Sequence, residues 1–132
     1  MISAGIILLC VLGEYAARET ACRFLTVSHN PGAAFGIMKG TPGIALTLSG
    51  IACAVILGVI YLADMKPLTR IGLSVMAGGA LSNFLERVFL GYVVDWIPVP
   101  FLDLRYNPAD VAISLGALIV FISMSKSRSE HV

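Results

Sequence analysis

A run of twenty uncharged residues at positions 44–63 restricts the fold of this chain more than any other feature of its sequence. A helix of about 20 apolar residues crosses the roughly 30 Å hydrocarbon core of a bilayer. The composition agrees with this interpretation, because 58% of the 132 residues are hydrophobic and 13% are charged. An average soluble domain has about 25% charged residues. The sequence therefore predicts a polytopic membrane protein.

Three other apolar segments have the length of membrane-spanning helices. We place the four spans at about residues 2–25, 44–63, 68–88 and 108–125, within a single integral membrane domain that covers residues 1–132. We expect the first span to be retained rather than cleaved as a signal peptide, because it lacks a positive leading segment and Glu14 interrupts it. The predicted fold class is all-α, with four transmembrane helices.

Four spans would place both termini on the same side of the membrane. The connection at 64–70 and the C-terminal tail then share that side and carry Lys66, Arg70, Lys126 and Arg128, whereas the loops opposite carry Lys39 and Arg105. The positive-inside rule favours cytoplasmic termini on this count, although arginines at the helix ends make the difference small. The loops 26–43 and 89–107 would then be extracytoplasmic, and the first of them has room for a small β-rich element.

Two aspartates lie where a membrane makes carboxylates costly. Asp95 follows the third span and Asp110 opens the fourth, so both are expected near the outer membrane face. An acid at the bilayer centre costs roughly 2.5–3.5 kcal/mol on insertion scales, so intramembrane acids usually have a function. Two close carboxylates can share one proton and activate water, as in aspartic proteases. The pair therefore favours a membrane-embedded aspartyl peptidase.

Several polar residues are predicted to gather around these aspartates. Asn83 and Arg87 are four residues apart, so they share one face of the third span, and Arg87 is placed to pair with one of the two carboxylates. Asn30 and Asn107 come from the two outer loops, and each is followed by proline. A plain turn is the alternative interpretation for Asn30 taken alone.

Five motifs, in order along the chain, resemble those of the lipoprotein signal peptidase family, also called signal peptidase II. They are Glu14-Tyr-Ala-Ala-Arg18, Asn30-Pro-Gly-Ala-Ala-Phe-Gly36, Gly78-Gly-Ala-Leu-Ser-Asn-Phe-Leu-Glu-Arg87, Gly91-Tyr-Val-Val-Asp95 and Asn107-Pro-Ala-Asp110. One such motif would be weak evidence, but five in register with four spans make a specific match. The chain departs from the usual family residues at Glu14, Arg18, Ser82 and Glu86.

The resemblance implies an aspartic endopeptidase that removes the signal peptide from diacylglyceryl-modified prolipoproteins, cleaving before the lipidated cysteine. It implies that Asp95 and Asp110 are catalytic, and that the site is lined by the substrate-binding residues Asn30, Asn83, Arg87 and Asn107. It also implies a multi-pass protein of the bacterial inner membrane, with its active site at the outer face. We expect no metal or other cofactor, a monomer, and lipid-modified signal peptides and membrane lipid as partners.

Two alternatives remain open from the sequence. A catalytically silent relative could bind lipidated peptides, but it would have no chemical reason to keep two costly acids. A small four-helix transporter would need polar residues through the depth of the bilayer, whereas the span at 44–63 has only Thr47 and Ser49 as polar side chains. In the first span we expect Glu14 and Arg18 to neutralise each other one helical turn apart, outside the active site.

Composition also disfavours other classes of protein. The net charge is +1, and no basic run is present that could follow a phosphate backbone, so we expect no nucleic-acid partner. Cys10, Cys22 and Cys53 show neither the spacing of metal ligands nor a disulfide pattern. We expect all three cysteines to be buried as small apolar side chains.

Overall fold

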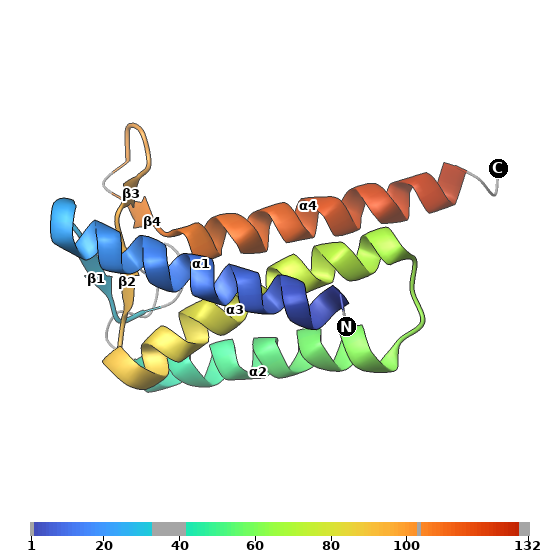
Figure 1. Ribbon diagram of the computed structural model, residues 1–132, viewed down its shortest axis with the longest axis horizontal. Helices are drawn as coiled ribbons and strands as arrows, with labels where there is room; N and C mark the ends of the chain where they lie inside the picture. Colours follow the sequence, from blue (N-terminus) through green and yellow to red (C-terminus); the bar gives the residue numbers. More distant parts are fainter. Residues whose placement is uncertain (1, 33–41, 103, 130–132) are drawn as a thin grey trace.

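Four long helices dominate the computed structural model, which describes residues 2–32, 42–102 and 104–129 (Figure 1). They are α1 (Ile2–Phe24), α2 (Pro42–Leu62), α3 (Pro67–Leu90) and α4 (Pro108–Ser129). The predicted helical framework is therefore confirmed. The Ala33–Gly36 part of the second motif and Lys39 lie outside the described residues.

Two of the four helices are long and apolar enough to cross a membrane. They are α2 and the Pro108–Lys126 part of α4. Large apolar side chains also lie on the outer surfaces of the helices, among them Leu9 of α1 and Leu118 of α4, which are 72% and 53% exposed. Such a surface is covered by lipid more favourably than by water. That α1 and α3 also cross the membrane stays a prediction.

Contrary to the prediction from the sequence, the cysteines are not all buried. Cys53 is buried, but Cys10 is half-buried and Cys22 is exposed on α1. The expectation that all three are buried is therefore wrong for Cys22, because the face of α1 that carries it contacts no other described helix closely enough to cover it.

Proline and glycine set the ends of the helices. Proline is the first residue of α2, α3 and α4, a position where its missing N–H costs no helical hydrogen bond. Gly91 ends α3 in a left-handed conformation with a φ of 82°, and its N–H donates to the carbonyl oxygen of Arg87 at 3.1 Å. This turn directs the chain away from α3 and into the strand that ends at Asp95.

Helix α3 packs against α1, α2 and α4, and glycines bring its backbone close to its neighbours. A Cβ atom on Gly79 would lie 2.4 Å from the carbonyl oxygen of Ala109, at the start of α4. A Cβ atom on Gly78 would lie 2.4 Å from the Cβ atom of Cys10 in α1. Small residues permit such close helix packing in membranes. The approach at Gly79 places α3 directly against the first turn of α4, which contains Asp110.

Two small antiparallel sheets lie at one end of the helices (Figure 1). Strand β1 (Ser28–Asn30) pairs with β2 (Val93–Asp95), so that Ser28 faces Asp95 and Asn30 faces Val93. Strand β3 (Ile97–Pro98) pairs with β4 (Arg105–Tyr106). The connection between α1 and α2 does contain a β-element, but its partner strand belongs to the connection between α3 and α4. This pairing joins the two loops and brings Asn30 close to Asp95.

The close packing at Gly79 leads to a prediction about stability. Gly79→Ala should lower the free energy of unfolding by about 1–3 kcal/mol, the usual range for overpacking, because its methyl group would meet the backbone of Ala109. Gly58→Ala in α2 is the matched control, since a Cβ atom there would meet nothing within 4 Å. Thermal unfolding in detergent measures both. If Gly79→Ala unfolds at the same temperature as the parent, α3 and α4 are not packed this closely.

Candidate active site

The structure brings Asp95 and Asp110 to the same cavity. Asp95 is the last residue of β2 and is 4% exposed, whereas Asp110 lies half-buried in the first turn of α4. Both line a cavity of about 510 Å³, to which Asn30, Asn83 and Arg87 also contribute. The five residues come from β1, α3, β2 and α4, so the cavity requires the whole end of the molecule that bears the strands.

Two asparagine side chains bridge the carboxyl groups. Asn107 is fully buried, and its Nδ2 donates to Oδ1 of Asp95 at 2.8 Å and to Oδ1 of Asn83 at 3.1 Å. Nδ2 of Asn83 in turn donates to Oδ1 of Asp110 at 2.8 Å. A continuous series of hydrogen bonds therefore joins Asp95 to Asp110 through Asn107 and Asn83. Buried networks of this kind fix a geometry when every member has a partner.

Asn30 holds the other oxygen of Asp95. Its Nδ2 donates to Oδ2 of Asp95 at 3.0 Å, and its Oδ1 accepts a hydrogen bond from the N–H of Gly32 at 3.0 Å. The second bond is the local turn that Asn-Pro-Gly favours. The turn interpretation and the site interpretation of Asn30 are thus both correct, because the turn orients the amide that contacts Asp95.

Asp110 and Asn107 also cap helix α4. Oδ1 of Asn107 accepts from the N–H of Asp110 at 2.9 Å, while Oδ2 of Asp110 accepts from the N–H of Asn107 at a longer 3.4 Å. This reciprocal arrangement is a capping box, which satisfies N–H groups left free at a helix start. The start of α4 therefore fixes the side chain of Asp110.

The surroundings of Asp95 favour its protonated form. Burial raises the pKa of Asp95 above its ordinary value, and the nearby charge of Asp110 raises it further. Hydrogen bonds from Asn30 and Asn107, together with the positive charge of Arg87, oppose this shift without cancelling it. An acid with a raised pKa beside a second acid is suited to holding a shared proton.

Arg87 does not pair directly with either aspartate, so that prediction is wrong. Its Nη1 donates to the carbonyl oxygen of Asn83 at 3.1 Å, and its Nη2 donates to the carbonyl oxygen of Gly32 at 2.9 Å. Among the described residues, the ion pairs involve Arg18 rather than Arg87. Arg87 therefore ties the end of α3 to the turn that positions Asn30.

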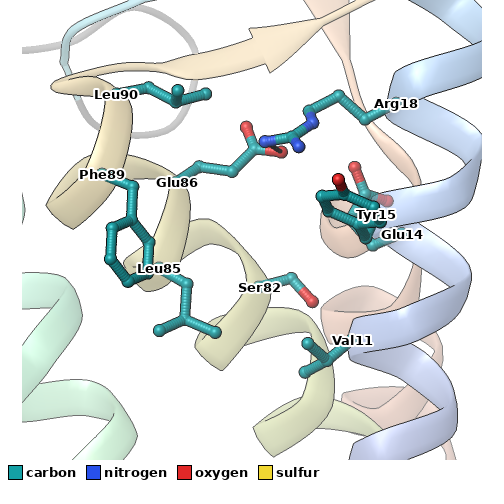
Figure 2. Close-up of a pocket in the computed structure, with 9 residues that line it drawn as sticks. All are labelled: Val11, Glu14, Tyr15, Arg18, Ser82, Leu85, Glu86, Phe89 and Leu90. Carbon is teal, nitrogen blue, oxygen red and sulfur yellow. Dashed lines mark ion pairs between the residues drawn. The ribbon is translucent and has the colours of Figure 1, made fainter.

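The predicted pairing of Glu14 with Arg18 is also wrong. Nη2 of Arg18 lies 2.9 Å from Oε1 of Glu19, and Nη1 lies 3.5 Å from Oε1 of Glu86. Glu14 is 5% exposed, and the ion pairs of Arg18 among the described residues do not include it. Figure 2 shows Arg18 of α1 and Glu86 of α3 pointing toward each other, and both residues line a cavity of about 300 Å³.

Glu86 lies beside the site rather than in the cavity of the two aspartates, and the sequence did not predict its contacts. It is 6% exposed, and its Oε2 accepts a hydrogen bond from the N–H of Val94 at 2.9 Å. The sequence offered one signal, since an acid beside Arg87 at the end of an apolar span is costly to bury without a partner.

The capping box leads to a second prediction about stability. Asn107→Ala should lower the free energy of unfolding by at least about 1 kcal/mol, the typical cost of losing a helix cap. Asn107→Ser keeps an oxygen that can cap α4 but loses the amide that contacts Asp95. Its free energy of unfolding should therefore lie between those of the parent and the alanine variant. Thermal unfolding in detergent ranks the parent and the two variants. Equal losses in the serine and alanine variants would show that capping does not contribute.

Comparison with known proteins places these features in one family. The family model for signal peptidase (SPase) II matches residues 2–126. A lipoprotein signal peptidase of Moorella thermoacetica is 42% identical over 101 residues, which cover 73% of this chain and 64% of that protein. A lipoprotein signal peptidase of Lactiplantibacillus plantarum is 32% identical over 130 residues, which cover 98% of this chain and 87% of that protein.

Two solved structures share the fold. A bacterial membrane enzyme determined at 2.3 Å superposes with a TM-score of 0.80 at 24% identity, covering 98% of this chain and 90% of the other. A second bacterial membrane enzyme, determined at 1.9 Å, gives a TM-score of 0.79 at 22% identity, covering 93% of this chain and 92% of the other. The arrangement of helices and strands described above is therefore that of a known membrane enzyme.

Proposed function

Because the chain belongs to the signal peptidase II family of aspartic peptidases, we propose that it removes signal peptides from prolipoproteins that already carry diacylglycerol. Cleavage falls before the lipid-bearing cysteine. The observation that carries the proposal is the pair Asp95 and Asp110, which line one cavity and are joined through the amides of Asn83 and Asn107.

We propose that the two aspartates share one proton and act on a water molecule. The ionised carboxylate accepts a proton from water while the water oxygen bonds to the carbonyl carbon of the scissile peptide. The protonated partner first polarises the carbonyl oxygen, and a proton from the pair then passes to the leaving amine as the C–N bond breaks. The raised pKa of Asp95 supports a pair that keeps one proton.

The neighbouring polar residues would orient the two acids. Asn30 and Asn107 each donate to Asp95, and Asn83 donates to Asp110. Arg87 contributes through the turn at Gly32. We therefore propose that these four residues position the carboxyl groups, and that the exposed parts of Asn30, Asn83 and Arg87 along the cavity also contact the substrate.

The proposed placement in the membrane follows from the two ends of the molecule. The start of α1, the end of α4 and the connection between α2 and α3 all lie away from the strands (Figure 1). If all four helices cross the bacterial cytoplasmic membrane, the termini and the basic residues Lys66, Arg70 and Lys126 share the cytoplasmic side. The site then lies at the outer face, where the lipid of a prolipoprotein can stay in the bilayer.

One chain supplies both acids, which supports action as a monomer.

The proposed reaction predicts the effect of removing each acid. Asp95→Asn and Asp110→Asn should each abolish cleavage. Asparagine is nearly isosteric with aspartate, so each variant should still fold. Its thermal unfolding temperature should lie somewhat below that of the parent, because the new NH2 group faces an N–H donor where a carboxylate oxygen accepted a hydrogen bond. The measurement is gel analysis of purified protein incubated with a diacylglyceryl-modified prolipoprotein. The matched control is Asp64→Asn, an exposed residue between α2 and α3. Substantial cleavage by either active-site variant would overturn the assignment of the pair.

A shared proton predicts a bell-shaped dependence of cleavage on pH. Since the pKa of Asp95 is raised, the pair should keep its proton above the value of about 3.9 that is ordinary for aspartate. Activity should fall at higher pH as that proton leaves, and at lower pH as the second acid is protonated. Both the fall at low pH and the fall at high pH describe the pair of aspartates rather than a single residue. Glu14, Glu86 and Arg87 are the other charged groups that interact with this pair. Flat activity across the acidic range, together with inhibition by a chelator, would indicate a metalloenzyme.

A further inference from the structure

Glu86 connects two helices to the strand that carries Asp95. It projects from α3, where one carboxylate oxygen lies 3.5 Å from Nη1 of Arg18 in α1. The other oxygen accepts the N–H of Val94 at 2.9 Å, within the short strand β2. Figure 2 shows that this carboxylate points from α3 toward α1, away from the helix axis.

The hydrogen bond to Val94 adds a backbone contact to a short strand, whose last residue Asp95 is otherwise held through its side chain by Asn30 and Asn107. The strand contains three residues and pairs with one other strand of equal length, β1. Val94 is 3% exposed, so its N–H would be buried without a partner if the carboxylate were absent. A buried unpaired N–H costs free energy comparable to a lost hydrogen bond. Glu86 thus fixes the residue immediately before Asp95.

Arg18 holds the carboxylate of Glu86 in place. Its side chain is 13% exposed and lies over the ring of Tyr15, with 4.9 Å from Cζ to the ring centroid. The guanidinium also pairs with Glu19, whose side chain is 45% exposed. Arg18 is therefore oriented by its own helix before it meets Glu86. An acceptor that is ionised makes a stronger hydrogen bond to an N–H than a neutral acceptor does.

We propose that Glu86 is a positioning residue for peptide cleavage, which acts through the N–H of Val94 to set the location of Asp95 relative to Asp110. Arg18 keeps the carboxylate of Glu86 directed at β2. This inference rests on the proposed function for its kinetic consequence, but the backbone contact that it describes does not depend on the reaction. Catalytic groups displaced by about 1 Å can lose roughly 100-fold in rate, so the location of β2 has a direct effect on turnover.

The first variants separate the hydrogen bond from the charge. Glu86→Ala removes the acceptor, and we expect kcat to fall about 30-fold, or about 2 kcal/mol in the barrier. We expect KM to change by less than about threefold, since the substrate contacts remain. Glu86→Gln keeps an oxygen that can accept the N–H of Val94, so it should recover most of the lost kcat.

Glu19→Gln is the matched control. It removes the negative charge beside Arg18 but keeps an oxygen that can accept from Nη2 of Arg18, and Glu19 has no hydrogen bond to β2 among the described residues. We expect its kcat to match that of the parent. The positioning role is wrong if Glu86→Ala keeps the parental kcat, if glutamine and alanine at position 86 are equally impaired, or if Glu19→Gln reproduces the loss.

Amide hydrogen exchange tests the contact without any reaction. Peptides that contain Val94 should exchange faster in Glu86→Ala than in the parent, in Glu86→Gln or in Glu19→Gln. If the parent fails to cleave a diacylglyceryl-modified prolipoprotein, the proposed function fails, whereas the exchange result still tests how Glu86 holds β2. Unchanged exchange at Val94 in Glu86→Ala would overturn the inference even in a fully active enzyme.

Discussion

The side-chain amides of Asn83 and Asn107 hold two acids together in one cavity, and most of the remaining structure supports that contact. Burial penalises the charge of Asp95, and two close carboxylates repel each other unless they share a proton. Each acid is therefore held by hydrogen-bond donors that do not themselves titrate. For these donors to reach both acids, α3 must lie against the first turn of α4. The close approach at Gly79, where a side chain would strike the backbone of Ala109, allows this.

The two acids are also fixed by the ends of secondary-structure elements. Asp110 is part of the capping box that starts α4, and Asp95 ends a strand held between β1 and Glu86. Helix α3 helps to hold both acids, because its Asn83 donates to Asp110 and its Glu86 accepts the N–H of Val94 in the strand of Asp95. The contacts that stabilise the ends of these elements are therefore the same contacts that orient the two acids. A residue such as Asn107 stabilises the helix and orients a carboxyl group with the same side chain.

The sequence predicted the helices and the gathering of the asparagines better than it predicted the ion pairs. The helix expected at 68–88 is observed as Pro67–Leu90, and the helix expected at 108–125 as Pro108–Ser129. Hydrophobic length and flanking prolines determine such limits locally. Spacing by four shows that Glu14 and Arg18 share a face, but it does not show which residue of another helix lies opposite. Glu86 lies opposite Arg18, and the pairing of β1 with β2 depends on two loops that are far apart in the sequence.

The position of Arg87 shows how the structure keeps the acids able to exchange a proton. An arginine paired directly with an aspartate lowers its pKa by roughly 1–3 units, which would remove the shared proton near neutral pH. In this structure the guanidinium of Arg87 donates to the carbonyl oxygens of Asn83 and Gly32 instead. Its charge opposes the raised pKa of Asp95 from a distance without reversing it. Neutral amides make the direct contacts, so the acids are oriented while one proton can still remain between them.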